Sequence, residues 1–240
     1  MSASKENSVT DQCLVNVLWT GGWDSTFRMI QLSRDGATVQ PYYILDTNRQ
    51  SALIEIKTIN KIRNELMEKY RNCEIKNLKI FELSTIDISK EIKEAHQRLV
   101  EESYMGAQYI WIAALAEKVD GLELGIHKDD KAEYFIRKLS GDENFLSDEK
   151  IIFGNLQFPI LDYTKLEMEK EAELSGDVNI LYKTWFCFTP INGTPCGVCP
   201  PCRYSIEEGM SKRFTKRAKL YNKFPKTYFR VRKQINRIIN

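Results

Sequence analysis

Long apolar runs are missing from this sequence of 240 residues. No run approaches the roughly 18 to 20 apolar residues that a membrane span requires, so we expect no membrane partner. The first twelve residues, MSASKENSVTDQ, are polar and contain no apolar signal core, which argues against secretion. Disorder on a large scale is also excluded, because 42% of the residues are hydrophobic and 28% are charged, as in ordinary globular domains. These absences predict a cytoplasmic globular protein.

Acidic residues are absent from the last 32 residues of the chain. All 33 acids lie at or before Glu208, so the body up to that point has a net charge of −9 and the remainder carries +11. Bases and aromatic residues are mixed between Lys212 and Arg237, a composition that suits a phosphate backbone or an acidic protein surface. Two interpretations stay open: this segment binds a protein or nucleic-acid partner, or it is a solvated helix that pairs with the acidic body.

The six cysteines are unevenly spaced. Two stand alone, and the other four follow the pattern Cys187-x8-Cys196-x2-Cys199-x2-Cys202. In a chain without an export signal, such clustering indicates a metal site before it indicates disulfides. Four thiolates on short turns form a closed tetrahedral centre, which is typical of structural zinc. An iron–sulfur cluster is the competing interpretation.

Short apolar segments alternate with helical patterns over the first half of the chain. The predicted strands are residues 13–19, 39–45, 78–83 and 122–126. The predicted helices are residues 24–34, 51–70 and 89–119, the last broken near Gly106. This alternation predicts an α/β fold with a parallel sheet flanked by helices. Ligands of such sheets bind beyond the carboxyl ends of the strands, so the turns after the first, second and fourth strands are candidate sites.

A glycine-containing loop follows the first predicted strand, with the sequence Thr20-Gly21-Gly22-Trp23-Asp24-Ser25-Thr26. The glycines allow close backbone approach, and the N–H groups at a helix N-terminus attract an anion. The hydroxyls of Ser25 and Thr26 add donors, and Asp24 is suited to cap the helix or to hold a magnesium ion bound to phosphates. No lysine follows at the spacing of a Walker loop. The sequence therefore predicts a phosphate-binding loop of another kind.

This loop resembles the SGGxDS(T) motif of the PP-loop ATP pyrophosphatases. The resemblance implies an enzyme that splits ATP between the α and β phosphates, adenylates a substrate oxygen and releases pyrophosphate. It implies that the loop residues bind ATP: Thr20, Gly21, Gly22, Asp24, Ser25 and Thr26. Asp46 follows the second predicted strand, where family members contact the nucleotide. The alternative for Asp46 is a turn residue that ends the strand.

Together, the loop and the four cysteines have the layout of the 7-cyano-7-deazaguanine synthase (QueC) family. Three further segments resemble that family: residues 158–167 (FPILDYTKLE), 184–187 (TWFC) and 195–199 (PCGVC). The resemblance covers roughly residues 13–208. It implies that ATP and Mg²⁺ activate the carboxylate of 7-carboxy-7-deazaguanine as an acyl-adenylate, that ammonia displaces AMP to give an amide, and that a second round gives the nitrile. It also implies a structural Zn²⁺ and a homodimer.

Catalytic roles follow from the same resemblance. Asp24 and Ser25 are expected to hold the phosphates, and Lys165 to balance the charge that builds on them. Asp130 matches the aspartate of the family's GVNxxD segment, but the GYPDCR segment that should follow is missing, because residues 131–137 read KAEYFIR. The acceptor therefore stays open: ammonia, another amine, or an amine on a protein or nucleic acid, as in divergent members found in antiviral-defence gene clusters.

The two histidines lie in different contexts. His127 follows the fourth predicted strand, where it is placed to accept a proton from ammonia. A residue that merely ends the strand is the alternative. His96 lies within a charged helical pattern, so we expect it on the surface.

Four regions are predicted: a polar tail (residues 1–12), a nucleotide-binding α/β domain (13–180), a zinc-binding subdomain (181–208) and a basic extension (209–240). Two other functions are open. A PP-loop thiolase acting on tRNA needs a catalytic cysteine pair facing the nucleotide, for which Cys13 and Cys73 are poorly placed, because one opens a predicted strand and the other lies in a connection rich in Lys and Asn. A non-catalytic nucleic-acid-binding module is the other, although such a module has no need for the complete phosphate loop.

Overall fold

The computed structural model describes residues 14–139, 147–226 and 228–230. The polar tail, Cys13 and the far end of the basic extension, including Arg237, lie outside the described residues. No helix within the described ranges is both long and apolar enough to cross a membrane.

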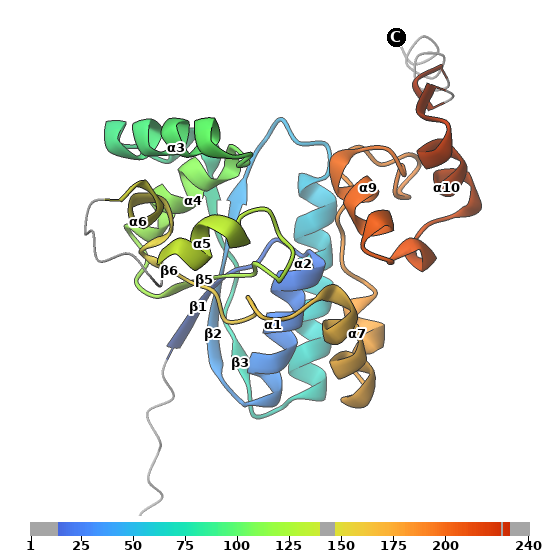
Figure 1. Cartoon of the computed structure of the whole chain (residues 1–240). Helices are drawn as coiled ribbons and strands as arrows, with labels where there is room; N and C mark the ends of the chain where they lie inside the picture. The colour runs from blue at the N-terminus through green and yellow to red at the C-terminus, as the bar shows by residue number, and fades with distance from the viewer. Residues whose placement is uncertain (1–13, 140–146, 227, 231–240) are drawn as a thin grey trace, which may run out of the picture.

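A parallel sheet forms the centre of the fold (Figure 1). Its strands are β1 (Leu14–Leu18), β2 (Thr38–Leu45), β3 (Glu74–Ile75), β4 (Lys79–Glu82), β5 (Leu122–Leu124) and β6 (Leu156–Gln157). The strand order is β3-β2-β1-β5-β6, with β4 also paired to β2, and every pairing is parallel. The predicted parallel α/β sheet is confirmed. Its centre is β1, because β1 pairs with β2 on one side and β5 on the other.

Helices pack on both faces of the sheet. The helices are α1 (Trp23–Arg34), α2 (Ala52–Lys69), η1 (Leu83–Thr85), α3 (Lys90–Glu102), α4 (Gln108–Ala116), α5 (Glu133–Leu139), α6 (Asp148–Phe153), α7 (Lys165–Leu174), α8 (Val178–Leu181), α9 (Pro200–Glu207), η2 (Ser211–Arg213) and α10 (Lys216–Lys223). Neighbouring strand residues face opposite ways. Val17 therefore joins the core beneath α1, α2, α7 and α8, whereas Leu18 joins the core beneath α3 to α6.

A third, smaller core surrounds the four clustered cysteines. Phe214, Ala218, Tyr221 and Tyr228 pack against them, so α10 is held on the cysteine cluster by its apolar face. In Figure 1, α9 and α10 lie together to one side of the sheet, beyond α2. The described start of the basic extension is therefore part of this third core.

Two details differ from the expectations. Strands β3 and β6 have two residues each and are too short to give a period-two pattern, so they were not predicted. The expected surface position of His96 is wrong, because its side chain is 8% exposed. The break in the helical stretch near Gly106 is confirmed, and it brings the Gly106 carbonyl, which also accepts from Tyr109 N, to within 3.1 Å of the buried His96 Nε2.

Candidate functional site

The loop after β1 turns sharply at Gly21. Its φ of +71° lies in the left-handed region that favours glycine. A Cβ at this position would lie 3.1 Å from Ile59 Cγ1 and 3.3 Å from the Glu55 carbonyl, both on α2. The Gly21 carbonyl accepts a hydrogen bond of 2.8 Å from Trp185 N. Both the dihedral angle and the close contact with α2 therefore require glycine here.

Gly22 is the N-cap of α1, and no side chain caps this helix. The first N–H groups of a helix have no intrahelical acceptors, so the start of α1 keeps unpaired donors and the positive end of its dipole. Gly125, just after β5, packs closely against the start of α1, because it has no Cβ; a Cβ there would lie 2.8 Å from Ser25 N. An uncapped helix N-terminus held in this way is an anion-binding arrangement.

The predicted loop residues take different positions. Thr20, Gly22 and Asp24 line a cavity, whereas Ser25 Oγ lies within the loop, 3.3 Å from Thr20 Oγ1. Thr26 is fully buried, and its hydroxyl accepts a hydrogen bond from Trp19 Nε1.

Asp46 is also away from the cavity. Its carboxylate accepts a hydrogen bond of 2.9 Å from Asn48 N, which is the geometry of a turn residue. The structure therefore brings Thr20, Gly22 and Asp24 to the cavity, but neither the other predicted loop residues nor Asp46.

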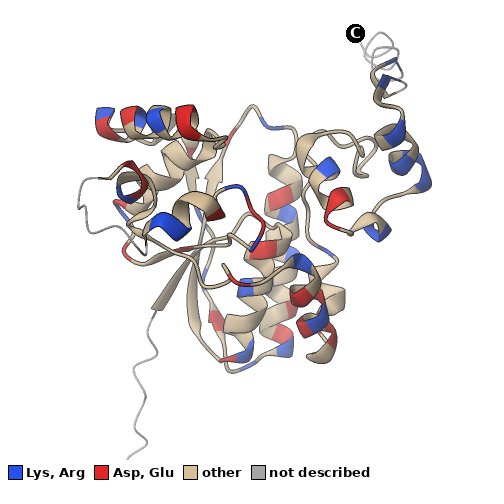
Figure 2. Ribbon diagram, in the orientation of Figure 1, with Lys and Arg blue, Asp and Glu red and all other residues tan. Residues whose placement is uncertain are grey.

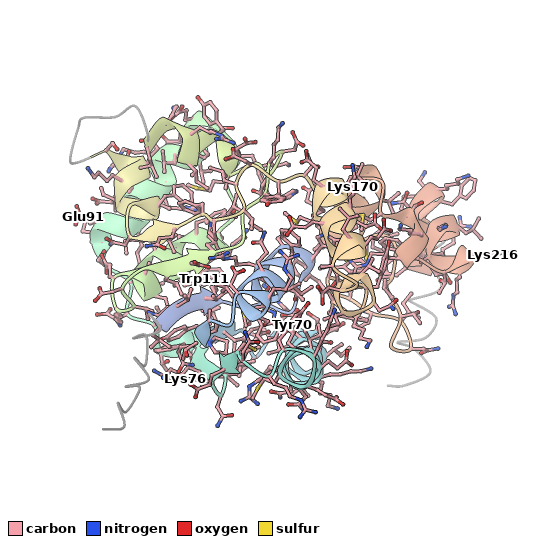
Figure 3. The ribbon with its side chains drawn as sticks, turned by 90° about the horizontal axis from the view of Figure 1, so that it is seen from below. Tyr70, Lys76, Glu91, Trp111, Lys170 and Lys216 are labelled. Carbon is pink, nitrogen blue, oxygen red and sulfur yellow. The ribbon has the colours of Figure 1, made fainter. Side chains whose placement is uncertain are left out.

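The cavity has a volume of about 490 Å³ and lies at the carboxyl end of β1, within the range of roughly 300 to 1,000 Å³ that small-molecule sites occupy. Its walls come from the loop after β1, the start of α4, the segment after β5, and two late segments at 185–188 and 200–213. Many of the lining side chains are aromatic. One of them is Trp111 on α4, which Figure 3 shows close to the sheet. This lining suits a flat ring.

His127 lies at the centre of a charged cluster in this cavity. Its Nδ1 is 4.0 Å from Asp24 Oδ1 and 3.9 Å from Asp130 Oδ2, and its Nε2 is 3.5 Å from Glu208 Oε1. Lys165 Nζ donates to Glu208 Oε2 at 2.6 Å. Asp24 Oδ1 and His127 Nδ1 are buried and have no hydrogen-bond partner among the described residues. Such unpaired groups are costly in a folded protein unless a ligand satisfies them.

The cluster shifts the pKa values of its members. Burial lowers the pKa of His127, but its hydrogen bond to Glu208 and the charge of Asp24 outweigh burial, so the pKa is raised. Lys165 behaves in the same way, with burial outweighed by Asp24 and Glu208. Burial raises the pKa of Asp130. In Glu208, burial is outweighed by His127 and Lys165, and the pKa is lowered. An acid–base group with a raised pKa therefore faces the phosphate loop.

Lys165 owes its position to a capping box at the start of α7. Thr164 Oγ1 accepts from Glu167 N at 3.2 Å, and Glu167 Oε2 accepts from Thr164 N at 2.8 Å. Lys165 is therefore the first residue of a helix whose start is fixed on both sides. In the Thr-Lys-x-Glu motif, Thr164 and Glu167 form the capping box, and Lys165 lines the cavity.

The four predicted metal ligands come together. The Sγ atoms of Cys187, Cys196, Cys199 and Cys202 lie within 4.8 Å of one another, and all four residues are buried. The Cys196–Cys202 and Cys187–Cys199 Sγ pairs are 3.8 Å and 3.9 Å apart. A tetrahedron with metal–sulfur bonds of about 2.3 Å has edges of about 3.8 Å. The spacing fits one tetrahedral ion, because the thiolates of a [4Fe–4S] cluster each bind a different iron and stand farther apart.

Donors around the sulfur atoms also suit a metal centre. Cys196 Sγ accepts from the backbone N–H groups of Val198 and Cys199 and from the Thr189 hydroxyl. Cys187 Sγ accepts from Cys196 N at 3.2 Å. Contacts among the four sulfur atoms lower the pKa of Cys196 and Cys199 and raise that of Cys187 and Cys202. The backbone and hydroxyl donors favour the thiolate form of the sulfur atoms that accept from them, and thiolate is the form that binds metal.

The metal centre and the phosphate loop are directly connected. The Trp185 N–H bond to Gly21 starts two residues before Cys187, and Arg213 on η2 donates to the Thr184 carbonyl and hydroxyl at 2.7 Å and 2.6 Å. Glu208 and Arg213 line the cavity, but they were not predicted as site residues. The sequence signal for Glu208 was its position as the last acid of the chain; Arg213 had no signal beyond its place in a basic run.

The described part of the basic extension is mostly unpaired. Lys212 forms an ion pair with Glu169, which is the pairing with the body that one interpretation predicted. Six other bases there are exposed and form no ion pair within the described residues: Lys216, Arg217, Lys219, Lys223, Lys226 and Arg230. Figure 2 shows basic residues and no acidic ones on α10, and Figure 3 shows Lys216 at the outer edge of the molecule. Leu220, Phe224 and Phe229 are exposed beside them.

Comparisons with known proteins give one family and several distant structures. The family described as queuosine biosynthesis protein QueC matches residues 14–211. A comparison with curated proteins gave no match.

Among solved structures, the U34-tRNA thiolase NcsA from Methanococcus maripaludis, solved with its [4Fe-4S] cluster, is 14% identical, with a TM-score of 0.43 over 96% of this chain and 73% of that one. A predicted subunit of tRNA methyltransferase from Methanocaldococcus jannaschii is 14% identical, with a TM-score of 0.40 over 84% of this chain and 91% of that one. NMN synthetase from Francisella tularensis is 14% identical, with a TM-score of 0.34 over 71% of this chain and 64% of that one.

Proposed function

The chain belongs to the QueC family, and from this premise we propose that it is an ATP-dependent ligase. It adenylates the carboxylate of a 7-deazaguanine and passes the acyl group to ammonia or another amine, releasing pyrophosphate and AMP. The observation that carries the proposal is the union, in one cavity, of the uncapped start of α1 with the unpaired Asp24 and His127. The start of α1 binds phosphate, and His127 supplies acid–base chemistry.

The first step joins the substrate carboxylate to the α-phosphate and breaks the bond to pyrophosphate. The backbone donors at the start of α1 hold the phosphates, and Lys165 balances the growing negative charge. Asp24 and Asp130 are the carboxylates that would hold Mg²⁺, since Asp24 Oδ1 has no other partner. When bound, Mg²⁺ neutralises phosphate charge.

In the second step the amine attacks the activated carbonyl, and AMP leaves. A proton must leave the amine, and His127 Nδ1 is the unpaired acceptor in the cavity. The hydrogen bond between His127 Nε2 and Glu208 fixes the orientation of the ring. Aromatic side chains around the cavity keep water from the activated acid.

The cysteine site binds a metal ion that we propose to be zinc. Its four thiol ligands fill a tetrahedron and leave no open position, as in structural zinc centres. The role of this ion is to fold residues 184–213 against the phosphate loop through the Trp185 and Arg213 contacts.

Product analysis tests the proposal. Purified protein is incubated with ATP, Mg²⁺, ammonia and 7-carboxy-7-deazaguanine, and AMP, pyrophosphate and the purine are followed by mass spectrometry. An amide with one AMP indicates a single round, and a nitrile with two AMP indicates both rounds. Asp24→Asn should abolish purine-dependent AMP release. Asp46→Asn is the matched control and should leave it unchanged, because Asp46 does not line the cavity. Equal loss in both variants would contradict the site.

A second candidate acceptor is an amine on a protein or nucleic acid held by the basic extension. It is favoured by the six exposed bases that form no ion pair within the described residues and by the exposed apolar side chains between them. In this case purified protein would release little AMP with ammonia alone, and a partner would become labelled with the deazapurine. Full turnover of the intact protein with ammonia, in the absence of any partner, would oppose this candidate.

A further inference from the structure

Arg213 has an unusual environment for a charged side chain. Its guanidinium lies between two aromatic rings, 4.9 Å from the centroid of Trp23 and 4.4 Å from that of Phe186. Its Nη2 atom donates to both oxygen atoms of Thr184. No hydrogen bond from Nε or Nη1 to a described residue is found. The plane of the guanidinium is therefore fixed, while one edge is left without an acceptor.

Counter-charge is missing at this position. Within the described ranges, Arg213 forms no ion pair, whereas the two other enclosed cations of the cavity do: Lys165 lies 2.6 Å from Glu208, and Arg49 lies 3.7 Å from Glu55. Burial lowers the pKa of Arg213 to about 10, and the nearby negative groups compensate for it only in part. Partial burial of a cation without a neighbouring anion costs free energy, because the charge loses hydration that no partner replaces. The fold retains this cost at a residue that lines the cavity.

A second donor without an acceptor lies beside it. Trp23 Nε1 is buried and has no hydrogen-bond partner among the described residues. Trp23 is also the first residue of α1, so its ring, the Arg213 guanidinium and the uncapped helix start are neighbours. The hydrogen bond between Trp185 and Gly21 holds the segment bearing Thr184 and Phe186 against the same loop. Donors from two distant parts of the chain therefore meet at one end of the cavity.

We propose that Arg213 binds an oxyanion of the reactants, with its free guanidinium edge facing that group. Resting on the proposed function, this assigns a ligand-binding role to a residue outside the phosphate loop. Guanidinium forms two parallel hydrogen bonds with carboxylate and phosphate alike. The anion is therefore a phosphate group of the nucleotide or the carboxylate of the acid that becomes activated. The two can be distinguished, because a change at Arg213 would weaken binding of a phosphate compound in the first case and of the carboxylic acid in the second.

The test measures binding of two probes by calorimetry: inorganic pyrophosphate with Mg²⁺, and 7-carboxy-7-deazaguanine. Arg213→Gln should weaken one of them by about 10- to 100-fold, the loss expected for a charge-assisted hydrogen-bonded pair, and Arg213→Lys should recover part of it. Arg203→Gln is the matched control, since Arg203 is exposed and does not line the cavity. Thr184→Val removes an acceptor of Arg213 but keeps the charge, so it should lower the melting temperature more than the affinity.

Metal content and melting temperature accompany each variant, so that loss of fold is not mistaken for loss of binding. Weaker pyrophosphate binding alone assigns Arg213 to the nucleotide phosphates, and weaker purine binding alone assigns it to the carboxylate. Unchanged affinity for both probes in folded Arg213→Gln protein overturns the assignment while leaving the proposed function intact. Failure of the wild-type protein to bind either probe overturns both. If Arg213→Gln does not fold, unchanged affinities in Arg213→Lys decide against the assignment, because lysine cannot reproduce the paired hydrogen bonds.

Discussion

Replacing Gly22 by alanine should separate ligand binding from folding. The backbone of Gly22 is extended (φ −79°), so an L-residue fits without strain. The added Cβ would meet only Thr20 Oγ1 at 3.2 Å and the Trp185 carbonyl at 3.8 Å. Alanine is a poorer N-cap than glycine, which lowers the free energy of unfolding by about 0.5 to 1 kcal/mol. It also reduces the conformational entropy of the unfolded chain, which raises the free energy of unfolding by about 0.4 to 1 kcal/mol. We expect the free energy of unfolding to change by less than about 1 kcal/mol, or roughly 2 to 4 °C in melting temperature.

The effect on ATP should be much larger. Gly22 lines the cavity at the uncapped start of α1, where a methyl group keeps a phosphate from approaching the backbone donors. Losing one or two hydrogen bonds to a charged group costs about 1.5 to 3 kcal/mol each, so purine-dependent AMP release at subsaturating ATP should fall by at least about tenfold. Thermal melting and the AMP assay on the same preparation give both quantities.

Gly125→Ala is the contrasting variant. Its Cβ would lie 2.8 Å from Ser25 N and 3.1 Å from the carbonyl carbon of Asp24, both backbone atoms that cannot rotate away. Overpacking of this kind costs about 1 to 3 kcal/mol, so stability and turnover should fall together. Full ATP turnover in Gly22→Ala, or a melting temperature as low as that of Gly125→Ala, would refute the reasoning.

Three further outcomes are expected. Cys199→Ser should lose the bound metal and melt at a lower temperature, measured by elemental analysis and calorimetry, because metal binding and folding are coupled; a metal-free variant of normal stability would contradict this. The pKa of His127 is raised, so its charged form stabilises the fold fully below about pH 6.5, and this contribution is lost as pH rises through the raised value. Turnover needs the neutral ring, so the acidic limb of the kcat profile should lie above pH 6.5 and move to lower pH in Glu208→Gln; an unmoved limb would exclude His127 as the base. The three exposed lysines of α10 are Lys216, Lys219 and Lys223. Changing all three to glutamine should weaken binding to a polyanionic partner and flatten its salt dependence, and equal affinity would argue against a partner at this surface.

The parts of the fold that were predictable are those encoded locally. β1, β2, β4 and β5 lie in short segments rich in apolar residues, and the helical patterns between them imply parallel pairing. The cysteine spacing and the Gly21-Gly22 loop are likewise short motifs whose geometry follows from neighbouring residues. For these elements, the structure confirms what the sequence pattern indicates.

The rest depends on contacts between distant residues. The buried His96 lies against the Gly106 carbonyl, which a helix break brings to it, and no periodicity within its own helix encodes that. Glu208 reaches His127 and Lys165 from 81 and 43 residues away in the chain. Arg213 lies in a basic run that resembles a solvated segment, yet its burial depends on the rings of Trp23 and Phe186.

The walls of the cavity have a consequence for the newly made protein. The phosphate loop is complete once residue 26 has been synthesised, but the wall that includes Tyr204, Glu208 and Arg213 is added almost two hundred residues later. At translation speeds of about 5 to 20 residues per second, the loop exists for roughly ten seconds or more before its cavity can close. A chain cut or stalled in this interval has a phosphate-binding turn but no enclosed site. We therefore expect that only a full-length, metal-loaded chain can protect an activated acid from hydrolysis, so incomplete copies do not consume ATP in making adenylate that water destroys.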